Sequence, residues 1–303
     1  MNKIIIPNTI FGVNTKEAYN KIMSEDYTKP VATPIINPIQ MKHLDNPESW
    51  IMLEGKTHEN YSYPDMLIDS ARIVYTSNNS EFLTASQKLG ITLQNTSKDF
   101  LGRDFIGKID WGQAMKLNLL LGNKNIPQRM FVDFLSLLYE GISGKKVYNA
   151  SGKILDSKFC EQIYEDIIKV QSPLRAEYLD ADFKYENNKL YIEYEHKLDS
   201  NGNLIAGKRE ELSDWLDKDK NPGIDLISLF KTANKHGLST SKTKSGDLYY
   251  HCPDKDNNSV SRFGAGSGRA GLNCVWVRSG TGSGLGVRAC TEGAAAKNLG
   301  GKK

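Results

Sequence analysis

The chain has 303 residues, of which 39% are apolar and 25% charged, and its formal net charge at pH 7 is +3. This composition is typical of a globular protein with one or two domains. The lysines form no basic block, which argues against nucleic-acid binding. No apolar run approaches the roughly 18 residues of a membrane helix, so we expect no membrane insertion. The apolar run at residues 4–6 is too short for a signal peptide.

The first 95 residues predict an irregular N-terminal region whose role the pattern does not reveal. They hold six of the ten prolines in the chain, and the residue before a proline avoids the helical region of backbone space. Residues 66–75 predict a short helix that runs into a strand, and residues 82–89 predict a second helix. We place the boundary of the next domain at residue 96.

Three amphipathic helices follow, and we interpret them as packing elements. Asp110 is the predicted N-cap of the first helix, although Asn118 interrupts its apolar face. Pro127 precedes the second helix, and Gly141 is its predicted end. Ser157 or Asp156 is the predicted cap of the third helix. The helices are expected over residues 111–121, 128–139 and 156–170.

Strand patterns replace the helical ones beyond residue 180. Residues 181–185 and 190–194 predict a β-hairpin with its turn at Asn187-Asn188. The string at residues 199–203 resembles half of a calcium loop but lacks the glutamate that such a loop requires. A plain Asn-Gly turn is therefore favoured there.

The cysteines form no CxxC pair, which argues against a zinc cluster. We interpret them as small buried apolar residues, and one disulfide among the last three is the alternative. Residues 254–257 are a weaker candidate for a calcium site, and no cofactor is expected. The cysteines are Cys160, Cys252, Cys274 and Cys290.

Carboxylates and one histidine form the remaining candidate for a chemical site. Asp180 and Asp182 are two residues apart, as are Glu193 and Glu195, so each pair shares one face of a strand. Such a face suits a metal or an acid–base site, but we favour a solvated strand face. His196 is interpreted as a surface residue, since the histidines show no metal-ligand spacing.

The glycine-rich tail, residues 259–290, has three competing interpretations. Gly266, Gly268 and Gly271 form a GxGxxG motif. A dinucleotide fold requires a helix after this motif, but a strand-like segment follows here. A flexible linker is the second interpretation, and it gives no reason for two distinct faces.

Alternation along the tail favours the third interpretation, a strand. Small and apolar residues alternate with glycine over residues 263–268, and the alternation continues over residues 270–275 after a slip of one residue. Such a slip is typical of a β-bulge. Glycine weakens a strand because it costs backbone entropy and packs nothing. We therefore infer that something other than stability selected the glycine face.

A frame of other residues accompanies these glycines: residues 257–260, Arg262, Phe263, Ala265, Ser267, Ala270, Leu272, Cys274, Ser279 and residues 285–289, with residues 176–183 and 248–253 upstream. The frame resembles the variable region of proteins diversified by retroelements, particularly members from archaeal viruses and small-genome prokaryotes. The resemblance covers roughly residues 110–290 and is most specific in the tail. It implies an α+β chain with a C-type lectin domain of the formylglycine-generating-enzyme type over residues 96–290.

The resemblance also implies a function. In this family an error-prone reverse transcriptase mutates adenines, and two such changes convert an asparagine codon to a glycine codon. The chain would then be a variable receptor-binding protein, not an enzyme, with an unknown protein or surface ligand, on a virion or a cell surface. Residues 291–303 would be a disordered tail. The alternative is a copper- or calcium-dependent enzyme or lectin on the same fold, with Cys274 and Cys290 as paired cysteines.

The resemblance assigns ligand contact to the side chains between the frame residues. Trp276 departs from the family pattern, because no change of adenines converts an AAY codon to a tryptophan codon. We expect this copy to bind weakly, since glycine offers little contact area, with Arg269 and Trp276 as its main contacts and Arg278 as a further candidate. The implied contact residues are Gly264, Gly266, Gly268, Arg269, Gly271, Asn273, Val275, Trp276, Val277, Gly280, Gly282 and Gly284.

Overall fold

The computed structural model describes residues 9–10, 13–14, 46–74, 79–92, 95–172, 174–216, 220–240, 246–255, 258–266 and 268–293. The strands are β1 (Thr9–Ile10), β2 (Val13–Asn14), β3 (Trp50–Leu53), β4 (Lys56–His58), β5 (Tyr61–Tyr63), β6 (Met66–Arg72), β7 (Asn95–Lys98), β8 (Asp104–Ile106), β9 (Arg175–Glu186), β10 (Lys189–Tyr194), β11 (Lys197–Leu198), β12 (Leu204–Ile205), β13 (Lys208–Glu211), β14 (Lys220–Ile224), β15 (Leu248–His251), β16 (Ser259–Ala265), β17 (Ala270–Trp276) and β18 (Leu285–Glu292). The helices are η1 (Pro47–Ser49), α2 (Ser80–Lys88), α3 (Trp111–Leu120), α4 (Gln128–Ile142), α5 (Ser157–Ile168) and α6 (Leu226–Thr232).

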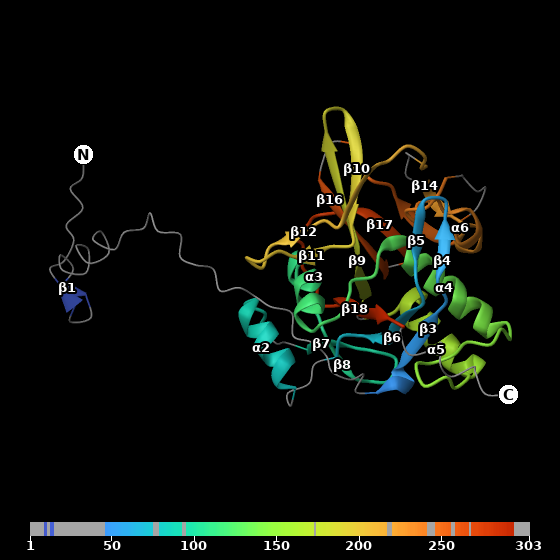
Figure 1. Ribbon diagram of the computed structural model, residues 1–303, viewed down its shortest axis with the longest axis horizontal. Coiled ribbons are helices and arrows are strands. Elements are labelled where there is room, and N and C mark those ends of the chain that lie inside the picture. Colours follow the sequence, from blue (N-terminus) through green and yellow to red (C-terminus); the bar gives the residue numbers. More distant parts are fainter. Residues whose placement is uncertain are drawn as a thin grey trace.

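A mixed sheet of ten strands runs through the centre of the protein (Figure 1). Its order is β14-β15-β17-β16-β9-β18-β6-β3, and β10 and β13 extend it from β9. The long strand β9 pairs with β16 along one edge, while its other edge is shared by β18, which is parallel, and β10, which is antiparallel. Helices and sheet together confirm the predicted α+β class.

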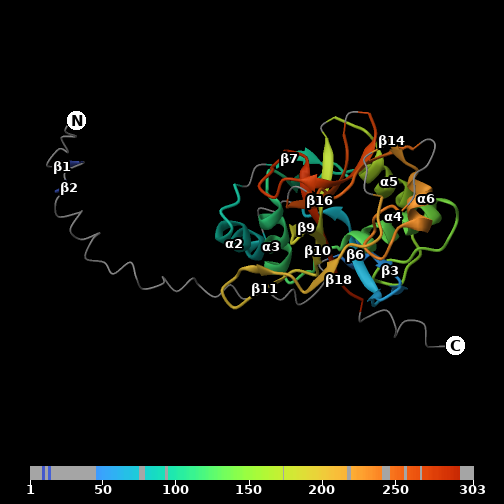
Figure 2. The ribbon, with the colours of Figure 1, turned by 90° about the horizontal axis from the view of Figure 1, so that it is seen from above.

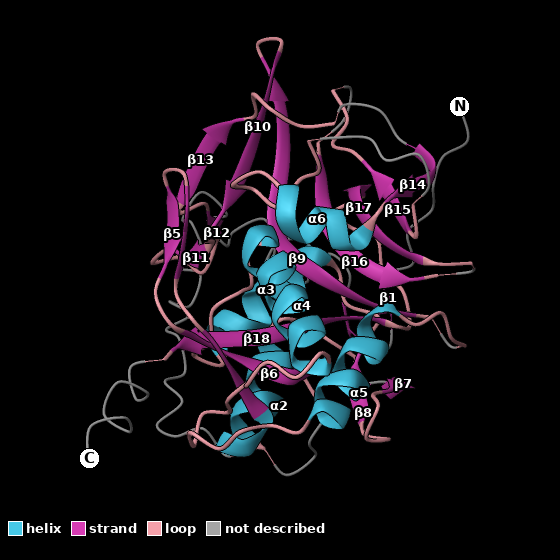
Figure 3. Cartoon of the chain, turned by 90° about the vertical axis from the view of Figure 1, so that its right-hand side faces the viewer, coloured by secondary structure: helices cyan, strands magenta, loops and turns pink. Residues whose placement is uncertain are grey.

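The helices cover the two faces of this sheet unequally. Helices α4, α5 and α6 enclose the larger core with β9, β15, β16 and β17, and they lie in front of the sheet in Figure 3. Helices α2 and α3 lie on the opposite side of β9 and β18, as Figures 1 and 2 show from two directions. Among the described helices, none combines the length and apolar character needed to cross a membrane.

The predicted start of α3 is confirmed in detail. Asp110 Oδ1 accepts a hydrogen bond from Gln113 N at 2.7 Å, and Asp110 N donates to Gln113 Oε1 at 3.1 Å, which completes a capping box. Asn118, which interrupts the apolar pattern, is fully buried. Its Nδ2 donates to Asn125 Oδ1 and to Arg288 O, both at 3.0 Å, so it joins α3 to β18.

Helix α4 is longer than predicted. It continues to Ile142, so Gly141 lies inside the helix and does not end it. A Cβ at Gly141 would lie 2.8 Å from Val147 Cγ2 and 2.9 Å from Cys160 Sγ. Glycine therefore permits close packing against α5, while α5 itself begins after the predicted cap Asp156.

The predicted turns are confirmed. Asn187 and Asn188 connect β9 to β10 with φ angles of 52° and 62°, the left-handed pair that a two-residue type I′ turn requires. At the second turn, Asp199 Oδ1 accepts from Asn201 N and Asn203 N, each at 2.8 Å. The Asp199 carboxylate thus satisfies a plain turn between β11 and β12.

Two strands before position 95, β3 and β6, belong to the same sheet as the tail. Residues 66–72 form strand β6 throughout, so the predicted short helix there is wrong, whereas the helix predicted at residues 82–89 is confirmed as α2. Strand β6 lies between β18 and β3. A boundary at residue 95 would therefore divide a hydrogen-bonded sheet.

At the C-terminal end, β18 runs to Glu292, and residues 294–303 lie outside the described residues.

Candidate functional site

The tail forms a hairpin inside the sheet, with one buried face and one open face. Buried and partly exposed residues alternate along β16 and β17, which confirms the predicted alternation. Phe263 and Leu272 are paired on the buried side, where the Phe263 ring lies 5.3 Å from that of Phe131 in α4. Gly264 and Gly271 are paired on the other side.

The slip in the alternation belongs to a hairpin turn, not to the predicted bulge. Ala265 pairs with Ala270, so residues 266–269 connect the two strands. A chain that reverses direction starts a new alternation, which explains the slip. The irregular register of this hairpin lies instead between Val260 and Arg262.

A pocket of about 190 Å³ opens on the glycine face of the hairpin. The parallel pairing of β15 with β17 sets Tyr249 beside Gly271 and His251 beside Asn273. No carboxylate is among the described residues that line the pocket, so its polar character is basic and neutral. The lining residues are Leu174, Tyr249, His251, Arg262, Gly264, Gly266, Arg269, Gly271 and Asn273.

Two arginines of the pocket are held against aromatic rings. The Arg262 guanidinium carbon lies 3.5 Å from the centre of the Trp276 ring, and that of Arg269 lies 4.6 Å from the centre of the Tyr249 ring. Arg269 Nη1 also donates to Gly246 O at 2.6 Å. A guanidinium stacked on a ring keeps its N–H edges available for in-plane hydrogen bonds.

The implied contact residues separate into two groups. The first group comprises five residues that line the pocket and their neighbours in the hairpin, of which Val277, directly after β17, is 59% exposed. In the second group, Gly280, Gly282 and Gly284 follow β17 in a segment that is tied to other elements. Lys108 N donates to Gly282 O at 3.0 Å, and the Tyr178 hydroxyl donates to Gly280 O. Of the twelve implied contact residues, those that line the pocket are Gly264, Gly266, Arg269, Gly271 and Asn273.

Space around the glycines differs from one position to the next. A Cβ at Gly284 would overlap the carbonyl oxygen of Leu174, and one at Gly264 would lie 2.5 Å from the Ala176 Cβ. At Gly280 the nearest atom is Trp276 Nε1, at 2.8 Å. Glycine at these three positions is explained by packing, so the inference that stability did not select it is wrong there.

Other glycines on the same segment have room for a side chain. A Cβ at Gly266 would meet only Leu174 Cδ1, at 3.9 Å, and one at Gly282 would meet only Leu285 Cβ, at 3.6 Å. A Cβ at Gly268 would meet the Tyr249 hydroxyl oxygen at 3.5 Å, an ordinary contact, but the φ of +116° strains any residue with a Cβ. Positions 266 and 282 are therefore the glycines most open to change.

Sequence reasoning missed four residues of the pocket, namely Leu174, Tyr249, His251 and Arg262. Arg262 was assigned to the frame, although it is in phase with Gly264 in the period-2 alternation, so the pattern itself places it on the open face. Tyr249 and His251 required knowledge that β15 pairs with β17. No local signal predicts that pairing.

Cys274 and Cys290 lie too far apart to form the paired cysteine site that the alternative enzyme hypothesis requires. Cys274 lies on β17 and Cys290 on β18, and β16 and β9 separate these strands. Three strand spacings correspond to about 14 Å, whereas a disulfide requires Cα atoms within about 7 Å. Both residues are fully buried, and burial raises the pKa of the Cys290 thiol.

Asp256 and Asn257 of the calcium candidate lie outside the described residues.

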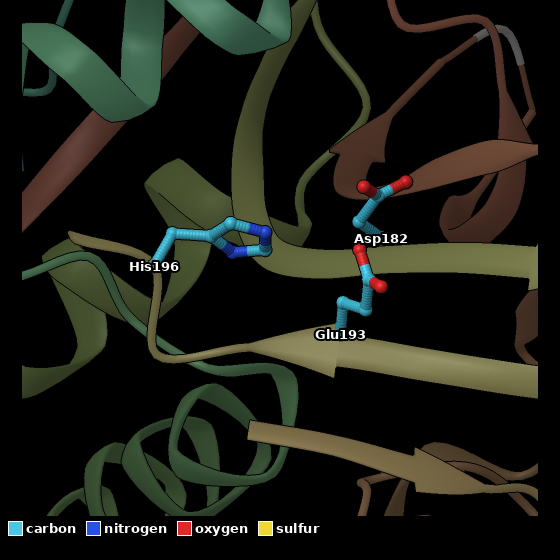
Figure 4. A group of neighbouring side chains, drawn as sticks. All are labelled: Asp182, Glu193 and His196. Carbon is cyan, nitrogen blue, oxygen red and sulfur yellow. The ribbon is translucent and has the colours of Figure 1, made fainter. Parts of the chain in front are cut away.

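A second polar cluster lies where β9 separates from β10, and it corrects two predictions. Asp180 and Asp182 are each 1% exposed, so they do not form a solvated strand face. His196 is 7% exposed and is not a surface residue. Its ring faces the carboxylates of Asp182 and Glu193 (Figure 4).

Comparison of the chain with models of protein families, with curated proteins and with solved structures gave no match.

Proposed function

We propose that this chain is a ligand-binding protein whose binding surface is the pocket face of β15, β16 and β17. The observation that carries the proposal is the pair of stacked arginines, Arg262 on Trp276 and Arg269 on Tyr249, at the rim of one pocket. Arginine and aromatic side chains supply most of the energy at protein interfaces. Glycine on the pocket walls adds little contact area, so affinity depends on these four residues.

The chemistry of the pocket favours an anionic group on the ligand. Arg262 forms no ion pair with any of the described residues and is partly buried. Arginine binds carboxylates through two parallel hydrogen bonds, and partial desolvation strengthens such a contact. The proposed ligand is a protein segment or surface molecule that presents a carboxylate to the pocket.

Diversification of the tail by a retroelement, on a domain of the C-type lectin type, is part of the same proposal. Support comes from the open face of the hairpin and from side chains that can change there without disturbing the core. The packing of Gly264, Gly280 and Gly284 restricts this proposal. Diversification would act on positions with room, such as Gly266, Asn273 and Val277.

A peptide selection tests the binding function. Random peptides displayed on phage are selected on the intact chain, and the affinity of the enriched peptides is measured for variants. We expect enrichment of acidic peptides and a loss of at least about tenfold in affinity, or about 1.4 kcal/mol, for Arg262→Ala. Lys169→Ala, which removes an exposed cation outside the pocket, is the control. Equal affinity of wild type and Arg262→Ala would contradict the proposal.

A genomic comparison tests diversification separately. The coding segment for residues 259–290 should have a near-copy beside a reverse transcriptase gene, with differences concentrated at adenines. Absence of such a copy would exclude the retroelement while leaving the binding function to the peptide experiment.

A further inference from the structure

We propose that Asp182, Glu193 and His196 form a binding site for one divalent transition-metal ion, of which Zn²⁺ is the representative probe. Asp182 and Glu193 are directly paired on β9 and β10, so their side chains lie on the same sheet face. His196 follows two residues after the end of β10. One ligand atom from each residue lies within 4.8 Å of the other two, and Figure 4 shows the three side chains converging.

Asp182 supplies a buried oxygen that lacks a partner among the described residues. Its Oδ2 forms an ion pair with Lys184 Nζ at 3.1 Å and accepts a hydrogen bond from the Arg278 guanidinium. Its Oδ1 is buried without a hydrogen bond. An unsatisfied buried polar atom costs about 1–3 kcal/mol, and more when the group is charged. A cation bound at Oδ1 would remove that cost.

His196 is oriented as a metal ligand. Its Nδ1 lies 2.5 Å from Asp180 Oδ1, and its backbone N donates to Asp180 Oδ2 at 3.0 Å. The Trp111 ring packs edge-on against the imidazole, with ring centres 5.1 Å apart. Since Asp180 engages Nδ1, Nε2 is the nitrogen left for a ligand. A carboxylate that holds the second nitrogen of a ligating histidine is the usual arrangement in zinc sites.

The ligand set determines the class of ion. Imidazole favours zinc and other first-row transition metals over calcium and magnesium, and carboxylates are accepted by both groups. Ligand atoms about 2.1 Å from one Zn²⁺ lie about 3.4 Å apart in tetrahedral geometry. The ligand atoms, now within 4.8 Å of one another, must therefore approach by up to about 1.4 Å. Three protein ligands would leave a fourth position for water.

Two neighbouring arginine side chains compete with a metal ion for the carboxylates of the site. This competition can be tested. Arg278 binds Asp182, and Arg209 Nη1 lies 3.1 Å from Glu193 Oε1. The Arg278 side chain is 45% exposed, so it can turn into solvent when a metal binds. Removal of Arg278 eliminates its competition for Asp182, and it should strengthen metal binding.

Calorimetric titration of the intact, chelator-treated chain with ZnCl₂ tests the site. We expect one ion per chain and a loss of affinity of at least about tenfold for Glu193→Gln, since even residues that only orient ligands contribute about 10–100-fold. Arg278→Ala should bind Zn²⁺ more tightly than wild type. Glu195→Gln is the matched control, because Glu195 is an exposed glutamate immediately after β10.

The variants are chosen so that a loss of Zn²⁺ affinity can be distinguished from a loss of folding. His196 is buried, so its replacement can disturb folding, whereas the Glu193 side chain is 17% exposed and tolerates an isosteric change. Visible absorption of the Co²⁺-loaded chain gives a second readout that reports coordination. Absence of Zn²⁺ binding, or equal affinity of wild type and Glu193→Gln, would overturn the proposal.

Discussion

The Arg262 guanidinium carbon lies 3.5 Å from the centre of the Trp276 ring, and the two residues come from neighbouring strands of one hairpin. Trp276 Nε1 is buried on the side of Tyr178, whose pKa a hydrogen bond from the Trp276 side chain lowers against the rise caused by burial. Stacking thus places a cation over the ring at the open edge of the core. The stacking contact therefore contributes to the stability of the hairpin and also positions a positive charge at the proposed binding surface.

A double-mutant cycle on this pair should reveal direct coupling. We expect Arg262→Ala, Trp276→Ala and the double variant to give an interaction energy of about 0.5–2 kcal/mol in urea unfolding, because a cation–π contact strengthens when it is partly desolvated. Additive effects of the two single changes would show that the stacking contributes nothing to stability.

Two glycines of the tail should respond in opposite ways to alanine. Gly284→Ala should destabilise the protein by about 3 kcal/mol or more, because its Cβ would overlap the Leu174 carbonyl oxygen. Gly266→Ala should change the free energy of unfolding by no more than about 0.5 kcal/mol, since its Cβ meets nothing closer than 3.9 Å. Urea unfolding monitored by circular dichroism measures both. Equal tolerance at the two positions would contradict the packing argument.

Glu177 should make the stability of the protein pH-dependent. Burial alone would raise the pKa of Glu177, but the guanidiniums of Arg288 and Arg72 hold that pKa below its ordinary value. Arg288 Nε and Nη2 contact both oxygens of the Glu177 carboxylate, at 2.8 and 2.9 Å. Because the folded-state pKa is depressed, this stabilisation is complete above the unfolded value of about 4.3 and is lost as pH falls through the folded value.

Glu177→Gln should therefore cost about 3–5 kcal/mol at pH 7, the usual effect of breaking a buried ion pair. The difference from wild type should shrink as the pH is lowered below about 4. Glu165→Gln is the control, since Glu165 forms only an exposed pair with Lys169. Denaturant unfolding at a series of pH values gives both curves, and a constant difference would count against the assignment.

A fragment that begins at residue 96 should not fold by itself. It would lack β6, whose Ile68 is fully buried and which pairs with β18 inside the sheet. The fragment would also lack Arg72, whose Nη1 lies 2.6 Å from Asp166 Oδ2 in the core. Circular dichroism and amide exchange should show no cooperative transition for residues 96–303. A fragment as stable as the intact chain would mean that the N-terminal strands are dispensable.

Elements whose stabilising partners lie close by in the chain could be predicted from the sequence. Asp110 and Gln113 close a capping box within one helical turn, and the Asn187-Asn188 pair specifies its own turn. Strand alternation distinguished the buried and open faces of the tail. These features succeed because their partners lie within a few residues, where backbone geometry alone sets the distances.

The two candidate sites depend instead on contacts between elements that are far apart in the chain. The neighbours of Gly284 and Arg262, and the pairing of Asp180 with His196, come from elements whose adjacency no local pattern encodes. Strand β6 also joined the sheet beside β18, more than 200 residues away in sequence. The physical reason is that burial depends on which surfaces meet. A histidine or aspartate at a strand end is solvated or enclosed according to elements far along the chain.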